Sequence, residues 1–254
     1  MIYDVQKASL LKRFSAFLLD FILIIVLASG FAFLLSWITQ IDSYTETLQT
    51  YYEEYGEKYG VDFNISAEDY EQLTQERKDY YQEAYEAIFK ENPDAYKAYR
   101  MSIALPMLIT TISVLLSYLV FEFIIPLCLK NGQTIGKKIF SLGVVFNNSV
   151  KITNFALFVR AIFGKYTIET MFPVLLIMLV LYRQMGILAL ILVAALLILQ
   201  IVLLFATKTR SFIHDTLAST VVVDMSSQMI FQSTDELIAY KEEIAKQQAE
   251  KKDY

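Results

Sequence analysis

Ionisable side chains interrupt two long apolar stretches of this sequence, where a charge is costly unless it has a partner or a task. Asp20 lies inside the stretch Phe14–Ile38, which contains no other charge. Glu122 lies inside a second apolar stretch, and His214 and Asp215 come shortly after the last one. Carboxylates placed in this way are suited to bind a proton, a cation or a basic side chain.

The two intramembrane carboxylates are predicted to lie at similar depth. Asp20 follows Arg13 by seven residues, and Glu122 precedes Lys130 by eight. At 1.5 Å per helical residue these separations correspond to about 10 Å and about 12 Å from the same boundary. Asp20 and Glu122 are therefore candidates to face one another, and each needs a partner from another helix.

Two hypotheses follow for these groups. In the first, Asp20 and Glu122 form a site for a proton or Na⁺, because neighbouring carboxylates favour binding of a proton and oxygen ligands suit a hard cation. His214 and Asp215 would then guard a cytoplasmic entrance. In the second, Asp20 pairs with a nearby arginine, and the network fixes helix packing. The residues of this ion site or polar network are Arg13, Asp20, Glu122, Arg160, His214 and Asp215.

The elements that position these groups are membrane-spanning helices. Hydrophobic residues make up 56% of the chain and the mean hydropathy is +0.43. The apolar runs are continuous, which indicates helices of about 20 residues and excludes a barrel. We predict an all-α membrane protein: a four-helix bundle with a helical extracytoplasmic loop and a small cytoplasmic β-hairpin. The predicted spans are Phe14–Ile38, Met101–Leu129, about Tyr166–Tyr182, and Gly186–Ala206.

Charge predicts the orientation of these spans. Lys and Arg gather in the N-terminal segment, in the connection 130–165 and after the last span. The segment 41–100 instead holds fifteen Asp and Glu against six Lys and Arg. Because positive residues mark the cytoplasmic side, both termini of this multi-pass chain are expected in the cytoplasm.

The connections carry their own signals. Asn154–Gly164 is interpreted as an interfacial or partly re-entrant helix capped by Asn154, with one long tilted helix as the alternative. Ile139–Phe146 and Val150–Ile152 suggest a hairpin across Asn147-Asn148, to which Thr220–Val223 adds a third strand. The tail 235–252 is predicted to be a polar helix capped by Ser233 and Glu236.

The outer segment 41–100 is predicted to be helical. Ser43 with Glu46 and Ser66 with Asp69 resemble capping boxes, Gly60 would end the first helix, and Asn92-Pro93 would separate the last two. Its eleven tyrosines allow two interpretations. They form a recognition surface for a partner or a cation, or they pack together in a solvated helical hairpin.

These predicted elements divide the chain into six segments. The divisions are 1–40 for the N-terminus and first span, 41–100 for the acidic loop, 101–129 for the second span, 130–165 for the basic hairpin and interfacial helix, 166–207 for the third and fourth spans, and 208–254 for the cytoplasmic tail.

Three blocks of residues together resemble the RDD family of bacterial membrane proteins, named for one arginine and two aspartates. The first block is Lys12–Asp20, in which Arg13 is the second residue and Asp20 the last. The second is Gly132–Lys138 with Gly143-Val144-Val145, and the third is His214-Asp215 with Thr220–Val223. The resemblance implies an RDD-like domain over residues 8–224, with 41–100 as an insertion. Ion transport has been suggested for the family.

Other chemistry finds little support in the residues. One His and one Cys argue against a His/Cys metal site, no serine nucleophile elbow is present, and Gly132–Lys137 lacks the spacing of a phosphate loop. We therefore expect no enzyme activity, no cofactor and no nucleic-acid partner.

The expected partners are the lipid bilayer, Na⁺ or H⁺, and a second copy or another membrane protein. The leading hypothesis is a small cation or proton transporter or transporter subunit; the alternative is a non-enzymatic scaffold or accessory subunit that binds through its outer loop.

Overall fold

The computed structural model describes residues 6–252, and these fall into two compact units. Unit 1 comprises the first helix up to Gly30 together with the chain from Ser113 onward, and unit 2 comprises residues 31–112. Both units are almost entirely helical, with one small antiparallel sheet in unit 1. The prediction of an all-α membrane-type fold is thereby confirmed.

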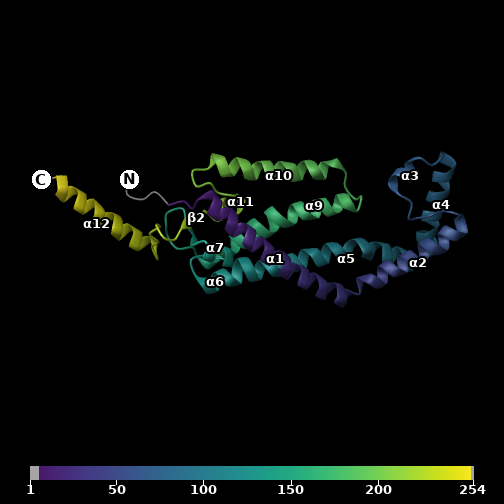
Figure 1. Ribbon diagram of the computed structural model, residues 1–254, viewed down its shortest axis with the longest axis horizontal. Coiled ribbons are helices and arrows are strands. Elements are labelled where there is room, and N and C mark those ends of the chain that lie inside the picture. Colours follow the sequence, from purple (N-terminus) through teal and green to yellow (C-terminus); the bar gives the residue numbers. More distant parts are fainter. Residues whose placement is uncertain (1–5, 253–254) are drawn as a thin grey trace. The chain divides into compact units, whose positions relative to one another are not determined.

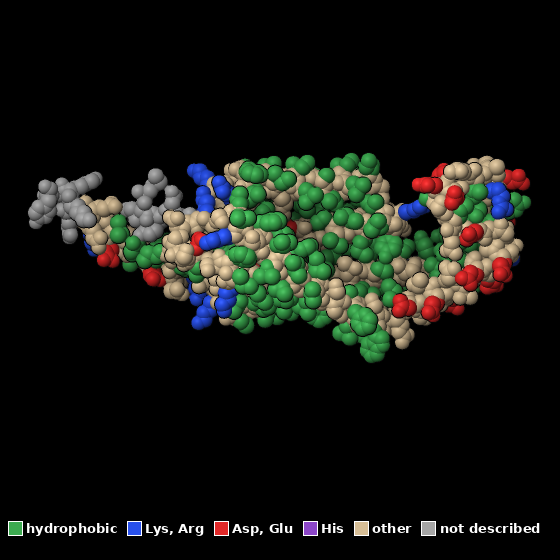
Figure 2. Space-filling model, in the orientation of Figure 1, with side chains coloured by type: hydrophobic (Ala, Val, Ile, Leu, Met, Phe, Trp, Pro, Cys, Tyr) green, Lys and Arg blue, Asp and Glu red, His purple; other side chains and the backbone are tan. Residues whose placement is uncertain are grey.

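Among the residues that the structure describes, four continuous helices are long and apolar enough to cross a membrane. Their apolar side chains are exposed over most of their length, and Figure 2 shows this apolar surface. A helix that exposes leucine and phenylalanine in this way is expected where lipid replaces water. In chain order the four are α1 (Leu10–Thr39); α5 (Pro93–Tyr118) continued by η1 (Leu119–Ile124) and α6 (Ile125–Leu129); α8 (Asn154–Phe158) continued by η2 (Val159–Met171) and α9 (Phe172–Leu181); and α10 (Ile187–Ala206).

The third of these helices is unbroken from Asn154 to Leu181. The interpretation of Asn154–Gly164 as a separate interfacial or partly re-entrant helix was therefore wrong, and the alternative, a single long helix, is observed. The hydroxyl of Thr153 accepts a hydrogen bond from the Ala156 amide at 3.2 Å, so Thr153 is the cap. The prediction that Asn154 caps this helix was wrong by one residue. Asn154 already has helical geometry and belongs to the first turn.

Wide π-helical segments occur in two of the four helices, and a proline follows each of them. The η1 segment is followed by Pro126 and the η2 segment by Pro173. Since proline has no N–H, the carbonyls four residues earlier, those of Glu122 and Glu169, cannot receive the usual helical bond. Wider pairing between residues five apart is favoured there, and such segments often occur at functional sites.

A two-stranded sheet and two short helices close one end of unit 1. Strands β1 (Leu142–Phe146) and β2 (Thr220–Asp224) pair antiparallel, with Val144 opposite Val222. The short helices are α7 (Ile135–Ile139) and α11 (Ile213–Leu217). Here α1 and α8 begin and α6 and α10 end, and lysines and arginines gather around it (Figure 2). We call this the basic end.

The predicted β-hairpin takes a different form. The chain turns at Asn147-Asn148, and Phe146 N–H donates to the Val150 carbonyl, as the sequence indicated. The returning arm forms only isolated bridges, from Lys151 to Val145 and from Val150 to Phe231. The strand that pairs with β1 along its whole length is β2. Thr220–Val223, expected as a third strand, therefore belongs to β2, the second strand of the sheet.

Beyond the sheet, α12 (Thr234–Lys252) forms the tail helix that the sequence predicted. The Ser233 hydroxyl accepts from the Glu236 amide at 3.2 Å, and the Glu236 carboxylate accepts from the Gln232 amide at 2.6 Å. Both side chains of the predicted cap, Ser233 and Glu236, thus accept a backbone hydrogen bond. Leu237 attaches the first turn by packing with Phe231.

Unit 2 contains α2 (Ile41–Tyr59), α3 (Ala67–Glu71) and α4 (Gln75–Glu91), and α5 begins at Pro93 after Asn92 (Figure 1). Gly60 ends α2 with a left-handed φ of 62°, and Ser66 caps α3 by accepting from the Asp69 amide, both as predicted. The prediction that Ser43 caps the first helix of this segment was wrong. The α2 helix starts two residues earlier, after Gln40, which has left-handed geometry and makes no side-chain cap.

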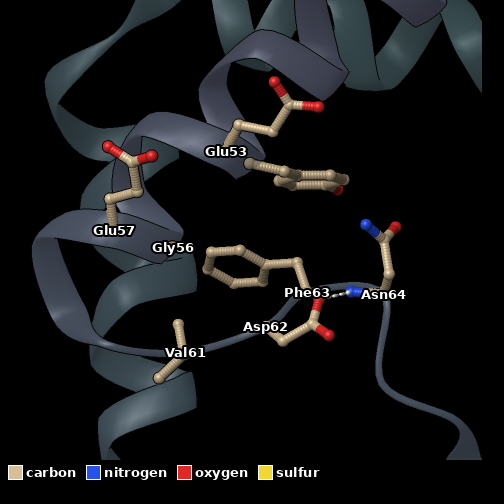
Figure 3. A pocket seen from close by; sticks show the side chains of 8 residues that line it. Glu53, Gly56, Glu57, Val61, Asp62, Phe63 and Asn64 are labelled. Atoms are coloured by element: carbon tan, nitrogen blue, oxygen red, sulfur yellow. Dashed lines mark hydrogen bonds between the residues drawn. The ribbon is translucent and has the colours of Figure 1, made fainter.

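Aromatic side chains form the core of unit 2. Tyr55 and Tyr81 are 5% and 8% exposed, and Tyr52 stacks on Phe63 with ring centroids 5.1 Å apart. Most of the tyrosines thus pack against one another, as in the second interpretation of the sequence. A pocket of about 290 Å³ opens beside this stack between α2 and residues 61–64 (Figure 3). The carboxylate side chains that line this pocket are exposed, so the pocket is an open hollow on the surface.

Candidate functional site

Asp215 lies at the centre of an arginine–aspartate cluster at the basic end. It is fully buried, at the start of α11, and its Oδ1 accepts from Arg160 at 2.9 Å. Arg13, from α1, approaches its Oδ2 at 3.3 Å and donates also to the Arg210 carbonyl at 2.7 Å. Thr220 donates to Oδ1 at 3.2 Å. Burial opposes ionisation, but Arg160, His214 and Arg13 outweigh it and hold the pKa of Asp215 well below its usual range.

His214 connects this cluster to η2. Its backbone N–H donates to Glu169 at 2.9 Å, its Nδ1 lies 2.7 Å from the same carboxylate, and its Nε2 lies 3.5 Å from Asp215. Burial lowers the pKa of His214 despite both carboxylates, so the imidazole is neutral at pH 7. Gly164 allows this approach, because a Cβ there would lie 2.6 Å from the His214 Cα.

Glu122 belongs to a separate lysine–glutamate cluster. Its buried carboxylate binds Lys165 closely from η2, and Lys137 from α7 lies 3.8 Å away. Lys137 Nζ is itself buried and has no hydrogen-bond partner among the described residues. The cluster is thus a carboxylate shared by two ammonium groups, of which one is held tightly and the other loosely.

Asp20 fastens α7 to α1. Its Oδ2 accepts from the Thr134 hydroxyl at 2.5 Å, and its Oδ1 accepts from the Gly136 amide at 2.8 Å. Thr134 in turn caps α7 by accepting from the Lys137 amide at 3.3 Å. A Cβ at Gly136 would collide with the Ala16 carbonyl, so only glycine permits this contact between α7 and α1. Asp20 therefore fixes the element that carries Lys137.

The η2 helix brings both clusters onto one face. Arg160 and Lys165 are five residues apart, and five is the hydrogen-bond spacing of a π-helix. The Thr167 hydroxyl bonds to the Ile162 carbonyl over the same interval. Arg160 therefore faces Asp215 while Lys165, one wide turn further on, faces Glu122.

The three sequence blocks that resemble a known family meet here. Arg13 and Asp20 of the first block bind Asp215 of the third and Thr134 of the second. A family model described as the RDD family matches residues 7–219. The chain belongs to the RDD family. No curated protein and no solved structure matches the chain.

The sequence-predicted site residues of this RDD protein are all buried in unit 1, but they form different pairs from those expected. Asp20 and Glu122 bind different partners and share no hydrogen bond among those of the described residues. Asp20 was predicted to pair with a nearby arginine, but the two arginines of the predicted network, Arg13 and Arg160, both bind Asp215. The expected pair of carboxylates is replaced by a carboxylate between two lysines.

Several residues of the site were missed, and simple signals point to some of them. Glu169 is a charge inside an apolar stretch, like Asp20, and precedes a proline by four residues, like Glu122. Lys137 stands in the second family block. Within the described residues, no group of three His, Cys, Asp or Glu side chains is arranged to hold a metal ion. The residues missed were Thr134, Gly136, Lys137, Gly164, Lys165 and Glu169.

Proposed function

We propose that this RDD protein is a small non-enzymatic transporter, or a transporter subunit, that moves protons or a cation exchanged for protons. The observation that carries the proposal is Lys137. Its ammonium group is buried, lacks a hydrogen bond among the described residues, and lies 3.8 Å from Glu122. A buried lysine with one distant ion partner loses its proton far more readily than a lysine in water.

The surroundings of Lys137 bring the pKa of its ammonium group close to neutral pH. Burial is the largest cause and lowers the pKa, Glu122 opposes it, and Lys165 and Arg160 lower it further, so the pKa of Lys137 lies at about 7. Asp20 exerts a weaker raising effect. A group with this pKa is half protonated at physiological pH, which is the condition for accepting and releasing a proton.

Charge balance supports exchange of the proton for a cation. With neutral His214 and protonated Lys137, the network holds four positive side chains and four carboxylates. Loss of the Lys137 proton leaves the network as a whole with one negative charge in excess, while Glu122 stays paired with Lys165. A proton or Na⁺ entering the site would restore neutrality, and carboxylate oxygens are suitable ligands for Na⁺. The members are Arg13, Arg160, Lys137, Lys165, Asp20, Glu122, Glu169 and Asp215.

The proposed orientation places the basic end in the cytoplasm of a bacterial cell, with both termini there and the chain in the inner membrane. The positive-inside tendency supports this orientation, since exposed lysines and arginines gather at the basic end (Figure 2). Four spanning helices are few for alternating access. We therefore propose that transport takes place in a homo-oligomer or with a membrane-protein partner.

Proton flux in proteoliposomes tests this function, with folded protein matched between samples. Lys137→Arg keeps a positive charge but cannot release it near neutral pH, since arginine stays protonated. It should reduce flux at least tenfold. Lys138→Arg, at the exposed neighbour, is the matched control and should keep wild-type flux. Equal flux in both variants would exclude Lys137 as the exchanging group.

The alternative function is a non-enzymatic membrane scaffold or accessory subunit. It is favoured by unit 2, which has an aromatic core of its own and exposes Tyr80, Tyr85 and Tyr96 at 45%, 38% and 50%. Absence of flux in wild-type vesicles, with the protein folded, would support this alternative. The search would then turn to membrane proteins that bind residues 41–100.

A further inference from the structure

A line of buried polar side chains extends from Glu122 along the same helix, away from the basic end. Ser113, Ser117 and Glu122 are 1%, 0% and 3% exposed. Their spacings are four and five residues. Four residues is the spacing of one face of an α-helix, and the five-residue step crosses η1, where the helix is wide. The π-segment therefore keeps Glu122 on the face that carries the two serines.

The facing helix η2 continues the polar line beyond the lysine–glutamate cluster. The Tyr118 hydroxyl lies 2.8 Å from the Thr170 hydroxyl. Because α5–η1 and η2 run in opposite directions, this pair lies one step further from the basic end than Glu122 and Lys165. Apolar side chains, Ile24 and Met171 among them, pack around the pair.

Ser113 forms the far end of this line. Its Oγ is buried and has no hydrogen-bond partner within the described part of the chain, while its carbonyl accepts from the Ser117 hydroxyl at 2.9 Å. Buried polar atoms are almost always hydrogen-bonded, to protein or to ordered water. An unpaired serine hydroxyl at the end of a polar line thus points to a water molecule as its ligand.

We propose that Ser113, Ser117, Tyr118 and Thr170 line a hydrated route by which protons reach Glu122 from the side opposite the basic end. The inference rests on the proposed function, which it deepens by naming the outer path. From Ser113 to Glu122 the route covers about 13 Å of helix. Hydroxyl groups both donate and accept hydrogen bonds, so with water between them they pass protons without carrying charge themselves.

Cysteine accessibility tests the route without relying on transport. In the full chain, Cys128→Ala removes the native thiol, and Ser113→Cys then places one at the end of the route. Thr167→Cys is the control, because Thr167 is exposed on the surface of η2 and its hydroxyl bonds to its own helix. Vesicles are treated with Ag⁺, a small hydrated cation that binds thiols. The protein is then denatured, and the thiols that did not bind Ag⁺ are counted by their reaction with a maleimide.

Ag⁺ should protect Ser113→Cys from the maleimide at least tenfold more than it protects Thr167→Cys. Equal protection would overturn the route. Should Ser113→Cys fail to fold, Ser117→Cys serves in its place, with the same expectation and the same refuting result. Flux measurements distinguish the two proposals. Absence of flux in wild-type vesicles would refute the proposed function. Normal flux together with a Ser113→Cys thiol that does not bind Ag⁺ would refute only the route.

Discussion

Replacing Asp215 by asparagine should strongly destabilise unit 1. The side chain is fully buried and is the shared acceptor of two buried arginines, at 2.9 Å and 3.3 Å. The substitution Asp215→Asn keeps the size of the side chain but removes its charge, leaving Arg13 and Arg160 uncompensated at 9% and 2% exposure. Breaking a buried ion pair by removing one partner costs about 3–5 kcal/mol.

This magnitude can be measured as a thermal shift. For a chain of 150–250 residues, 1 kcal/mol corresponds to about 2–4 °C, so the melting temperature should fall by roughly 6–20 °C. The assay is loss of the monodisperse detergent-solubilised protein after heating. Asp224→Asn is the control, because it breaks the exposed pair with Lys12 and should leave the melting temperature nearly unchanged.

A melting temperature for Asp215→Asn that matches the control would refute the assignment of Asp215 as the centre of the cluster. A second step checks the mechanism. Adding Arg160→Met to Asp215→Asn removes one of the stranded charges, so the double variant should melt above the single one. A further loss of similar size would mean that the two side chains act independently.

Three other outcomes follow from the contacts. Gly164→Ala pushes a methyl group into the α11 backbone and should cost about 1–3 kcal/mol, measured by the same thermal assay. Thr134→Val removes the hydroxyl that bonds Asp20 and caps α7, and should cost about 1–3 kcal/mol, whereas Thr134→Ser should be close to wild type. For Lys137 the folded pKa of about 7 lies below the ordinary value of about 10.4, so the unfolded chain binds more protons in between and stability should rise from pH 7 to pH 10. Lys137→Met should remove this rise, and Lys138→Met should retain it.

The four spanning helices could be predicted from the sequence because a bilayer imposes a simple requirement, a long apolar run, that each helix meets independently. The caps at Gly60, Ser66 and Ser233 were predictable for a similar reason, since each depends on residues within one turn. The cap at Ser43 failed because α2 begins directly after α1, with a break at Gln40 that the sequence does not mark.

The pairing of the charged residues was not predictable in this way. Asp20 and Glu122 lie at similar depth by residue count, but depth does not specify the face of the helix or the neighbour. The π-segments add a further rotation, because a five-residue step displaces every later side chain relative to an α-helix. Only the position of the prolines after Glu122 and Glu169 indicates where that rotation occurs.

The site combines a fixed part and an exchangeable part, and the η2 helix contacts both through Arg160 and Lys165. Arg160 and Arg13 both contact Asp215 directly, at 2.9 Å and 3.3 Å, and these two contacts form the fixed part. Lys137 differs, with a pKa of about 7 and a single loose contact to Glu122. Its deprotonation would leave Lys165 to balance that carboxylate, and η2 carries Lys165 one wide turn from Arg160. A change of charge at Lys137 would therefore act on a helix whose other contact is held in place, which is what the proposed proton-dependent transport needs.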